Sequence, residues 1–162
     1  MNTTWSDLDS PIGPLRVHTD GTAITTVEFH PFREATGEMD DAHPVLVEAK
    51  RQLQSYFDGE LRDFDLPLAP TGTEFRRRVW AALAEIPYGA TTSYGVVARA
   101  LGLAPGASRA VGTANGANPI PIVVPCHRVV GADGSLTGYA GGLERKRLLL
   151  NLERGSTEPA LF

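Results

Sequence analysis

Residues Ser93 to Asn118 read SYGVVARALGLAPGASRAVGTANGAN and contain two short helical patterns separated by a turn. Tyr94 to Leu101 predicts a short helix that stops at Gly102, because glycine ends helices readily. After a Pro-Gly turn, Ser108 is the predicted cap of a second helix, Arg109 to about Asn115. A short helix, a turn with glycine and a second helix with a polar start indicate a helix-turn-helix.

The second of these helices consists almost entirely of small residues around one arginine, Arg109. A helix of small side chains can approach another backbone closely. One interpretation is tight packing against a neighbouring helix. The other is a helix that lies in a DNA groove and inserts Arg109, as minor-groove binders do with wedges and arginines. These residues alone leave both open.

The N-terminal half has a different pattern. Residues 3–30 have strand character and predict a small antiparallel sheet that begins near Thr4: residues 15–19 alternate, Asp20-Gly21 is a turn signal, and residues 23–29 are rich in β-branched side chains. Residues 31–43 predict a loop, and Pro44 to Asp58 predicts an amphipathic helix.

The C-terminal half is predicted to be mostly helical. A helix from Phe75 to Ile86 has Thr71 or Thr73 as its cap, and a last helix runs from Glu144 to Glu153. Between them, Asp133-Gly134 predicts a hairpin within residues 129–139. The fold class is therefore α/β (α+β), with a helix-turn-helix in its second part.

The Pro-punctuated run of residues 64–70 is the predicted linker. It divides the chain into a sheet-and-helix domain over 1–70, a helical domain over 71–155 and a tail over 156–162. Residues 1–70 carry 13 acidic and 5 basic side chains, whereas residues 71–162 carry 6 and 10. The basic half could attract a polyanion, although ordinary scatter of charge is an alternative.

Composition excludes several classes of protein. A single cysteine excludes an intrachain disulfide and suits a reducing cytoplasm. The N-terminus lacks the pattern of a signal peptide, and no apolar run approaches the roughly 20 residues of a membrane span. His18, His30 and His43 are too scattered to indicate a metal site.

The one cysteine, Cys126, follows an apolar run and precedes His127 and Arg128. A thiol needs a proton acceptor or a positive neighbour to become a good nucleophile at neutral pH, and both stand next to it. If only the Cys126-His127 dipeptide is considered, the alternative that Cys126 is a buried small hydrophobic residue is favoured.

Glu153 follows Leu149 by four residues and Leu150 by three, so its carboxylate lies on the leucine face of the last helix. A carboxylate on an apolar face is costly unless it is paired, and a histidine held in one tautomer is a natural partner. The alternative is a frayed helix end with Glu153 in water.

The run NPIPIVVPCHRV, Asn118 to Val129, closely resembles the active-site signature of the O6-alkylguanine-DNA alkyltransferases. The N-terminal half resembles the bacterial members more loosely, through residues 9–15 and 56–60. Further matches in the same order are Phe75–Gly89, Thr92–Gly95, Ser108–Gly112 and Thr137–Leu143.

The resemblance implies that Cys126 takes the alkyl group from guanine O6. His127 would deprotonate it through a bound water, and Glu153 would orient His127. Asn118 would hold the turn that carries the thiol. Tyr94 would donate a proton toward the departing guanine and press on a phosphate.

The resemblance also implies a DNA surface. Arg109 would fill the gap left by the flipped nucleotide, and Tyr139 with the backbone of Val129-Val130 would wall the base pocket. The remaining residues expected at the DNA are Ser108, Ala110 and Gly112. The partner would be duplex DNA with O6-alkylguanine, bound through the minor groove, with O4-alkylthymine as a further candidate substrate. No cofactor, membrane or obligate protein partner is implied.

Two departures from family patterns bear on these expectations. Some relatives hold zinc through N-terminal cysteines, and this chain has no spare cysteine, so we expect no metal. Ala140 follows the pocket tyrosine where some relatives have serine, which leaves substrate preference open.

Two functions from other classes remain as alternatives. A helix-turn-helix regulator or lesion sensor would keep its activity without Cys126. A cysteine hydrolase would turn over repeatedly and would need an oxyanion hole, for which the sequence gives no candidate.

Overall fold

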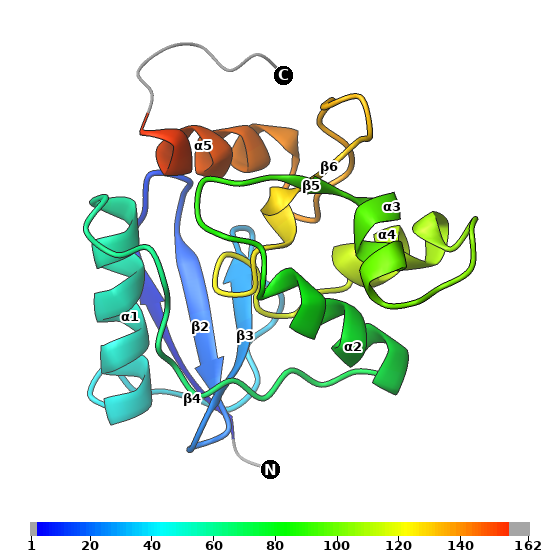
Figure 1. Ribbon diagram of the computed structural model, residues 1–162. Coiled ribbons are helices and arrows are strands. Elements are labelled where there is room, and N and C mark those ends of the chain that lie inside the picture. Colours follow the sequence, from blue (N-terminus) through cyan, green and yellow to red (C-terminus); the bar gives the residue numbers. More distant parts are fainter. Residues whose placement is uncertain (1–2, 156–162) are drawn as a thin grey trace. The chain divides into compact units, whose positions relative to one another are not determined.

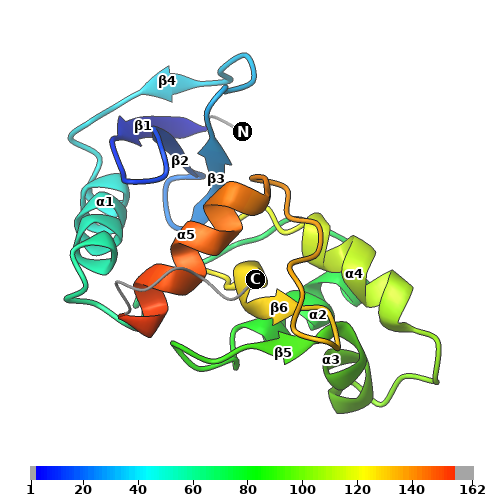
Figure 2. The same cartoon turned by 90° about the horizontal axis from the view of Figure 1, so that it is seen from above.

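The computed structural model describes residues 3–155, shown in Figures 1 and 2. The chain forms two compact units, Met1–Thr71 and Gly72–Phe162, which are described separately. The tail expected over 156–162 lies outside the described residues.

The first unit contains a four-stranded sheet in the order β3-β2-β1-β4. Strands β1 (Thr4–Leu8), β2 (Leu15–Thr19) and β3 (Ile24–Phe29) pair antiparallel, which confirms the predicted sheet and its start. Strand β4 (Glu38–Met39) lies within the predicted loop and pairs parallel with β1. Two residues are too few to show a strand periodicity in the sequence.

Helix α1 (Pro44–Phe57) contacts β1, β2 and β3, and it lies along the sheet in Figure 1. The ring of His43 caps it by accepting a hydrogen bond from the Val45 amide. Leu46, Leu53 and Tyr56 of its apolar face are fully buried. The strand residues Leu15 and Val17 are fully buried too, because alternate strand residues face the same side of the sheet.

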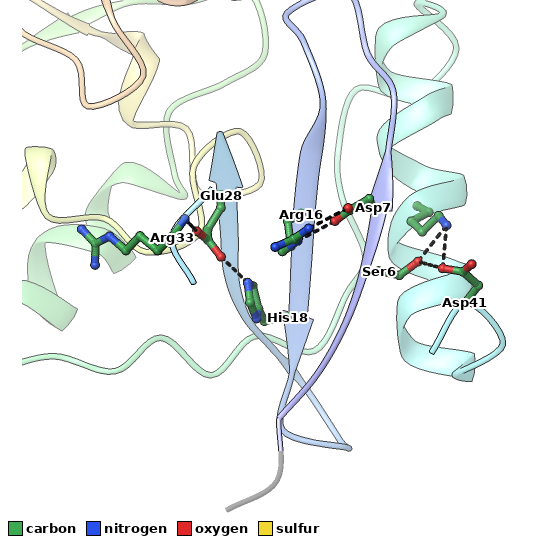
Figure 3. Close-up of polar contacts among 8 residues, drawn as sticks. Ser6, Asp7, Arg16, His18, Glu28, Arg33 and Asp41 are labelled. Atoms are coloured by element: carbon green, nitrogen blue, oxygen red, sulfur yellow. Dashed lines mark hydrogen bonds and ion pairs between the residues drawn. The ribbon is translucent and has the colours of Figure 1, made fainter. Parts of the chain in front are cut away.

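Several strand side chains of this unit pair with one another (Figure 3). Arg16 donates two hydrogen bonds to Asp7, at 2.7 and 2.9 Å, and its guanidinium lies 3.9 Å from the centre of the Trp5 ring. His18 pairs with Glu28. Within residues 3–155, no group of three or more His, Cys, Asp and Glu side chains could hold a metal ion.

The second unit begins with α2 (Glu74–Leu83), which Thr73 caps by accepting from the Arg76 amide at 3.2 Å. The helix ends three residues before the predicted Ile86. A turn follows it, in which the Ile86 amide donates to the Leu83 carbonyl. Ile86 is nevertheless buried, so the apolar pattern that extended the prediction reflects packing after the helix ends.

Helices α3 (Tyr94–Ala100) and α4 (Ser108–Gly116) contact each other and form the predicted helix-turn-helix. Ser93 caps α3 by accepting from the Val96 amide. The predicted cap of α4 is wrong: Ser108 is its first helical residue, Ala107 precedes it, and no side chain caps the helix.

The predicted hairpin around Asp133-Gly134 is also wrong. β6 (Val129–Val130) pairs parallel with β5 (Thr92–Ser93), a segment far away in sequence. Asp133-Gly134 does form a turn, closed by a 2.9 Å hydrogen bond from the Gly131 amide to the Ser135 carbonyl. The turn signal was correct, but local sequence cannot reveal a strand partner that comes from a distant segment.

Helix α5 (Leu143–Arg154) completes the second unit and contacts a single 3-10 turn, Cys126–Arg128. It ends at Gly155, whose φ of 63° lies in the left-handed region that glycine adopts without strain. None of the helices within residues 3–155 has the length and apolar character needed to cross a membrane.

Candidate active site around Cys126

The segment before the thiol is held by Asn118. Its Nδ2 donates to the Val124 carbonyl at 2.8 Å, and its Oδ1 accepts from the Ile120 amide at 3.0 Å. Between these two points Ile122 has a φ of 76°. A β-branched residue in this region is strained by roughly 1–3 kcal/mol, and such strain persists only where surrounding contacts impose it. The Asn118 side chain supplies two of those contacts.

Cys126 begins the 3-10 turn and is only 4% exposed. Its amide donates to the Val124 carbonyl at 2.8 Å, and its carbonyl accepts from Asn115 Nδ2 at 3.3 Å. Burial raises the pKa of the Cys126 thiol to about 11, while the Asn118 side chain, the charge of Lys146 and the Tyr139 side chain act in the opposite direction. The surrounding groups thus favour the thiolate that burial disfavours.

His127 and Glu153 form a buried pair. His127 Nε2 lies 2.6 Å from Glu153 Oε2, and both side chains are almost completely inaccessible. Glu153 is therefore not at a frayed helix end in water, and the alternative interpretation of this residue is wrong. Arg128 donates to both oxygens of the same carboxylate, and the Gly89 amide donates to Oε1 at 3.3 Å.

These contacts determine which nitrogen of His127 is available. Arg128 donates to both oxygens of Glu153, which keeps the carboxylate ionised, and an ionised carboxylate can only accept hydrogen bonds; Nε2 is therefore the protonated nitrogen of a neutral His127. Nδ1 is buried and has no hydrogen-bond partner among the described residues. Burial lowers the pKa of His127, and Arg128 and Lys146 lower it further against the opposing effect of Glu153. A neutral imidazole with a free Nδ1 can act as a base.

Lys146 is a residue of this site that was not expected from the sequence. Its side chain is fully buried, and Nζ donates to the carbonyls of Val129 at 2.7 Å and Thr137 at 3.0 Å. Burial lowers its pKa to about 8, and the Cys126 thiolate acts to raise it. The same spacing that placed Glu153 on the leucine face also places Lys146 there, so the signal was present.

Tyr94 lies at the start of α3. Its hydroxyl shares a 2.6 Å hydrogen bond with Thr137, and its ring lies over Gly112 of α4. A Cβ at Gly112 would stand 3.7 Å from the ring, which is ordinary contact. Thr137 is thus bound both to Tyr94 and, through its carbonyl, to Lys146.

The small residues of helix α4 were interpreted either as tight packing against a neighbouring helix or as a surface for DNA, and the two sides of the helix bear on these in turn. On its buried side, the Trp80 indole of α2 donates to the Ala114 carbonyl at 2.8 Å, an approach that small side chains permit. On its exposed side, Arg109 and Ala110 line a groove of about 560 Å³ together with Arg76 of α2. Neither arginine side chain makes an ion pair within the described part of the chain.

The expected site residues thus fall into two groups. Cys126, His127, Glu153 and Asn118 share one hydrogen-bonded region, with Val129, Val130 and Tyr139 next to it. Arg109, Ala110, Gly112 and Ser108 lie on α4, and Tyr94 contacts that helix. Sequence reasoning assigned no role to the buried residues Lys146 and Asn115. It indicated Arg128 as the positive neighbour of the thiol, whereas the Arg128 guanidinium binds Glu153, and Lys146 is the cation that acts on Cys126.

Comparison with known proteins matches almost the whole chain. Residues 4–70 match the family model of the 6-O-methylguanine DNA methyltransferase ribonuclease-like domain, and residues 74–155 match that of its DNA-binding domain. The methylated-DNA–protein-cysteine methyltransferase of Mycobacterium bovis is 52% identical over 161 residues, which cover 96% of this chain and 94% of that protein. The Methanosarcina acetivorans protein of the same name is 51% identical and covers 92% of this chain and 97% of its own length.

Solved structures agree with these matches. The crystal structure of Mycobacterium tuberculosis OGT in complex with DNA has a TM-score of 0.86 and 49% identity, and covers 99% of this chain and 96% of its own. An O6-methylguanine-DNA methyltransferase from Pyrococcus kodakaraensis, at 24% identity and a TM-score of 0.56, supports the fold alone. From its sequence, its fold and its relatives, the chain belongs to the 6-O-methylguanine DNA methyltransferase family.

Proposed function

We propose that this protein repairs O6-alkylated guanine in duplex DNA by moving the alkyl group irreversibly to Sγ of Cys126. The observation that carries the proposal is the chain of contacts from Asn118, through the Cys126 turn, to the buried His127–Glu153 pair. A cysteine that served only as core packing would need no adjacent histidine held in one tautomer by a buried carboxylate.

The chemistry requires one proton to leave the thiol. His127 Nδ1 accepts this proton across one water molecule, while Glu153 stabilises the imidazolium that forms. The Sγ–carbon bond then forms as the carbon–O6 bond breaks, and the bonding electron pair leaves with guanine O6. Tyr94 donates a proton to the departing guanine, so that the leaving group is neutral. Lys146 supplies positive charge that favours the thiolate.

The thiol is buried, so the base must leave the helical stack to reach it. The helix-turn-helix supplies a surface for this step, with α4 in the minor groove. Arg109 inserts into the duplex and occupies the space that the flipped nucleotide vacates. Ser108, Ala110 and Gly112 allow the backbone of α4 to approach the DNA, and Tyr139 with Val129-Val130 forms the pocket for the base.

The product is a thioether, and a thioether is not hydrolysed by the side chains around Cys126. Each protein molecule therefore acts once, and the reaction needs no cofactor. We assign both DNA binding and alkyl transfer to residues 71–155. Residues 1–70, with their acidic excess, are repelled by phosphate and help to orient the other half toward the duplex. In a bacterial cell, the DNA substrate places this activity in the cytoplasm.

The test is to locate the methyl group. A duplex that carries one O6-methylguanine is incubated with the protein, which is then digested and analysed by mass spectrometry. A gain of one methylene on the peptide with Cys126 is expected, and Cys126→Ser should gain nothing. Binding without methylation would instead favour the lesion sensor, and repeated turnover the hydrolase.

A further inference from the structure

Arg128 has no role in the reaction described so far, although it is one of the most completely bound side chains of the second unit. It is 6% exposed. Its Nε donates to Glu153 Oε1 at 2.8 Å, Nη2 donates to Glu153 Oε2 at 3.0 Å, and Nη1 donates to the Ile86 carbonyl at 2.6 Å. Its guanidinium carbon lies 5.7 Å from the centre of the Tyr88 ring.

We infer that Arg128 is a positioning residue for alkyl transfer: it holds Glu153 ionised and in one orientation, so that the carboxylate accepts the Nε2 proton of His127 and leaves Nδ1 free as the base. This inference deepens the proposed function and rests on it.

The geometry restricts the carboxylate to one orientation. A guanidinium and a carboxylate that share two parallel hydrogen bonds are coplanar, and the third arm of Arg128 is fixed at the Ile86 carbonyl. The Glu153 oxygen nearest His127 therefore stays 2.6 Å from Nε2. A lysine at position 128 would provide a similar charge but only a point contact, so it would not fix the plane of the carboxylate.

The charges around His127 lead to the same assignment. The charged groups that act on the His127 ring are Glu153 and Lys146 of α5 and Arg128 of the 3-10 turn. Glu153 favours the imidazolium, whereas the two cations oppose it. Without Arg128, the buried His127–Glu153 pair would keep an additional proton up to a higher pH. A His127 that already carries a proton on Nδ1 cannot accept one from the thiol.

Two substitutions test this inference. Arg128→Met removes both the charge and the two parallel hydrogen bonds to Glu153, whereas Arg128→Lys keeps the charge alone. Arg147→Met is the matched control, because Arg147 pairs with Glu144 on the exposed side of α5. Two quantities are measured in each full-length variant. One is the pH profile of methyl transfer from free O6-methylguanine to Cys126, and the other is the protonation of the His127 ring nitrogens by NMR.

In Arg128→Met, the acid limb of the rate profile and the His127 titration should both move up by about one pH unit or more, the usual effect of a lost neighbouring charge. Arg128→Lys should show a smaller shift and a plateau rate reduced about tenfold, because orientation is lost. Arg147→Met should match the wild type.

A folded Arg128→Met whose profile is lowered equally at every pH, with an unmoved His127 titration, would overturn the inference and leave Arg128 with a purely structural role. Where Arg128→Met does not fold, Arg128→Lys decides: wild-type rate and wild-type His127 tautomer overturn the inference, and a mixed tautomer supports it. Failure of the proposed function is distinguishable, because the wild type would then accept no methyl group while the NMR titration still reports on Arg128.

Discussion

Glu153→Gln is the substitution that perturbs the buried cluster most informatively, because it keeps the shape of the side chain. In the wild type, Oε1 accepts from Arg128 Nε and the Gly89 amide, and Oε2 accepts from His127 Nε2 and Arg128 Nη2. A glutamine has one oxygen and one NH₂ group, so in either orientation one pair of donors faces another donor. If the NH₂ group faces His127, the ring must accept at Nε2, and its proton moves to Nδ1.

The size of the effect follows from these contacts. Breaking a buried ion pair by removing one partner costs about 3–5 kcal/mol, and the glutamine keeps half of the hydrogen bonds, so the lower end applies. For a chain of 162 residues, about 3 kcal/mol lowers the melting temperature by about 6–12 °C. Loss of the base at Nδ1 should slow methyl transfer about 100-fold, the lower end of the usual contribution of general-base catalysis.

The assay combines thermal unfolding by circular dichroism with the rate of methyl transfer from free O6-methylguanine to Cys126. Glu144→Gln is the matched control, because it makes the same change on the same helix at an exposed ion pair, which contributes about 0–1 kcal/mol. A Glu153→Gln protein with the melting temperature and the rate of the Glu144→Gln control would refute this account of the cluster.

Three further predictions concern the other parts of the site. Arg109→Ala should weaken binding to duplex DNA and reduce the slope of log affinity against log salt concentration by up to about 1. Arg77→Ala, on the exposed side of α2, serves as the comparison. An unchanged affinity and rate on duplex DNA would remove the role of Arg109. Tyr94→Phe keeps the ring over α4 but removes the hydroxyl, so methyl transfer should slow about tenfold or more in a single-turnover assay. An unaltered rate would show that the departing guanine takes its proton from another donor. Lys146→Met should raise the pKa of the Cys126 thiol and slow its reaction with iodoacetamide at pH 7, and equal rates in both proteins would contradict the proposed charge effect.

The sequence predicted those parts of the fold that depend on local pattern. The three long strands, α1 and the helix-turn-helix follow from periodicity, caps and glycine stops. The hairpin at Asp133-Gly134 was wrong because Val129 and Val130 pair with Thr92 and Ser93, and pairing between distant segments leaves no mark on either segment alone. β4 was missed because two residues carry no periodicity.

In the candidate site too, local sequence pattern predicted some residues, whereas others depend on contacts between distant segments. Glu153 was placed correctly on the leucine face of its helix, and the structure buries it against His127. Lys146 satisfies the same pattern but was missed, because an exposed lysine is the usual expectation and only the folded chain brings the carbonyls of Val129 and Thr137 to its ammonium group. The two hydrogen bonds from Arg128 to Glu153 likewise depend on contact between the 3-10 turn and α5.

In the proposed reaction, Cys126 accepts one alkyl group and cannot react again. The most direct measurement is a titration in which a duplex with O6-methylguanine is present in several-fold excess over protein, and restored guanine is counted to completion. We expect a plateau at one guanine restored per protein molecule, with the protein fully methylated at Cys126. Restoration that continues past one equivalent, or a plateau at one with Cys126 unmodified, would contradict it.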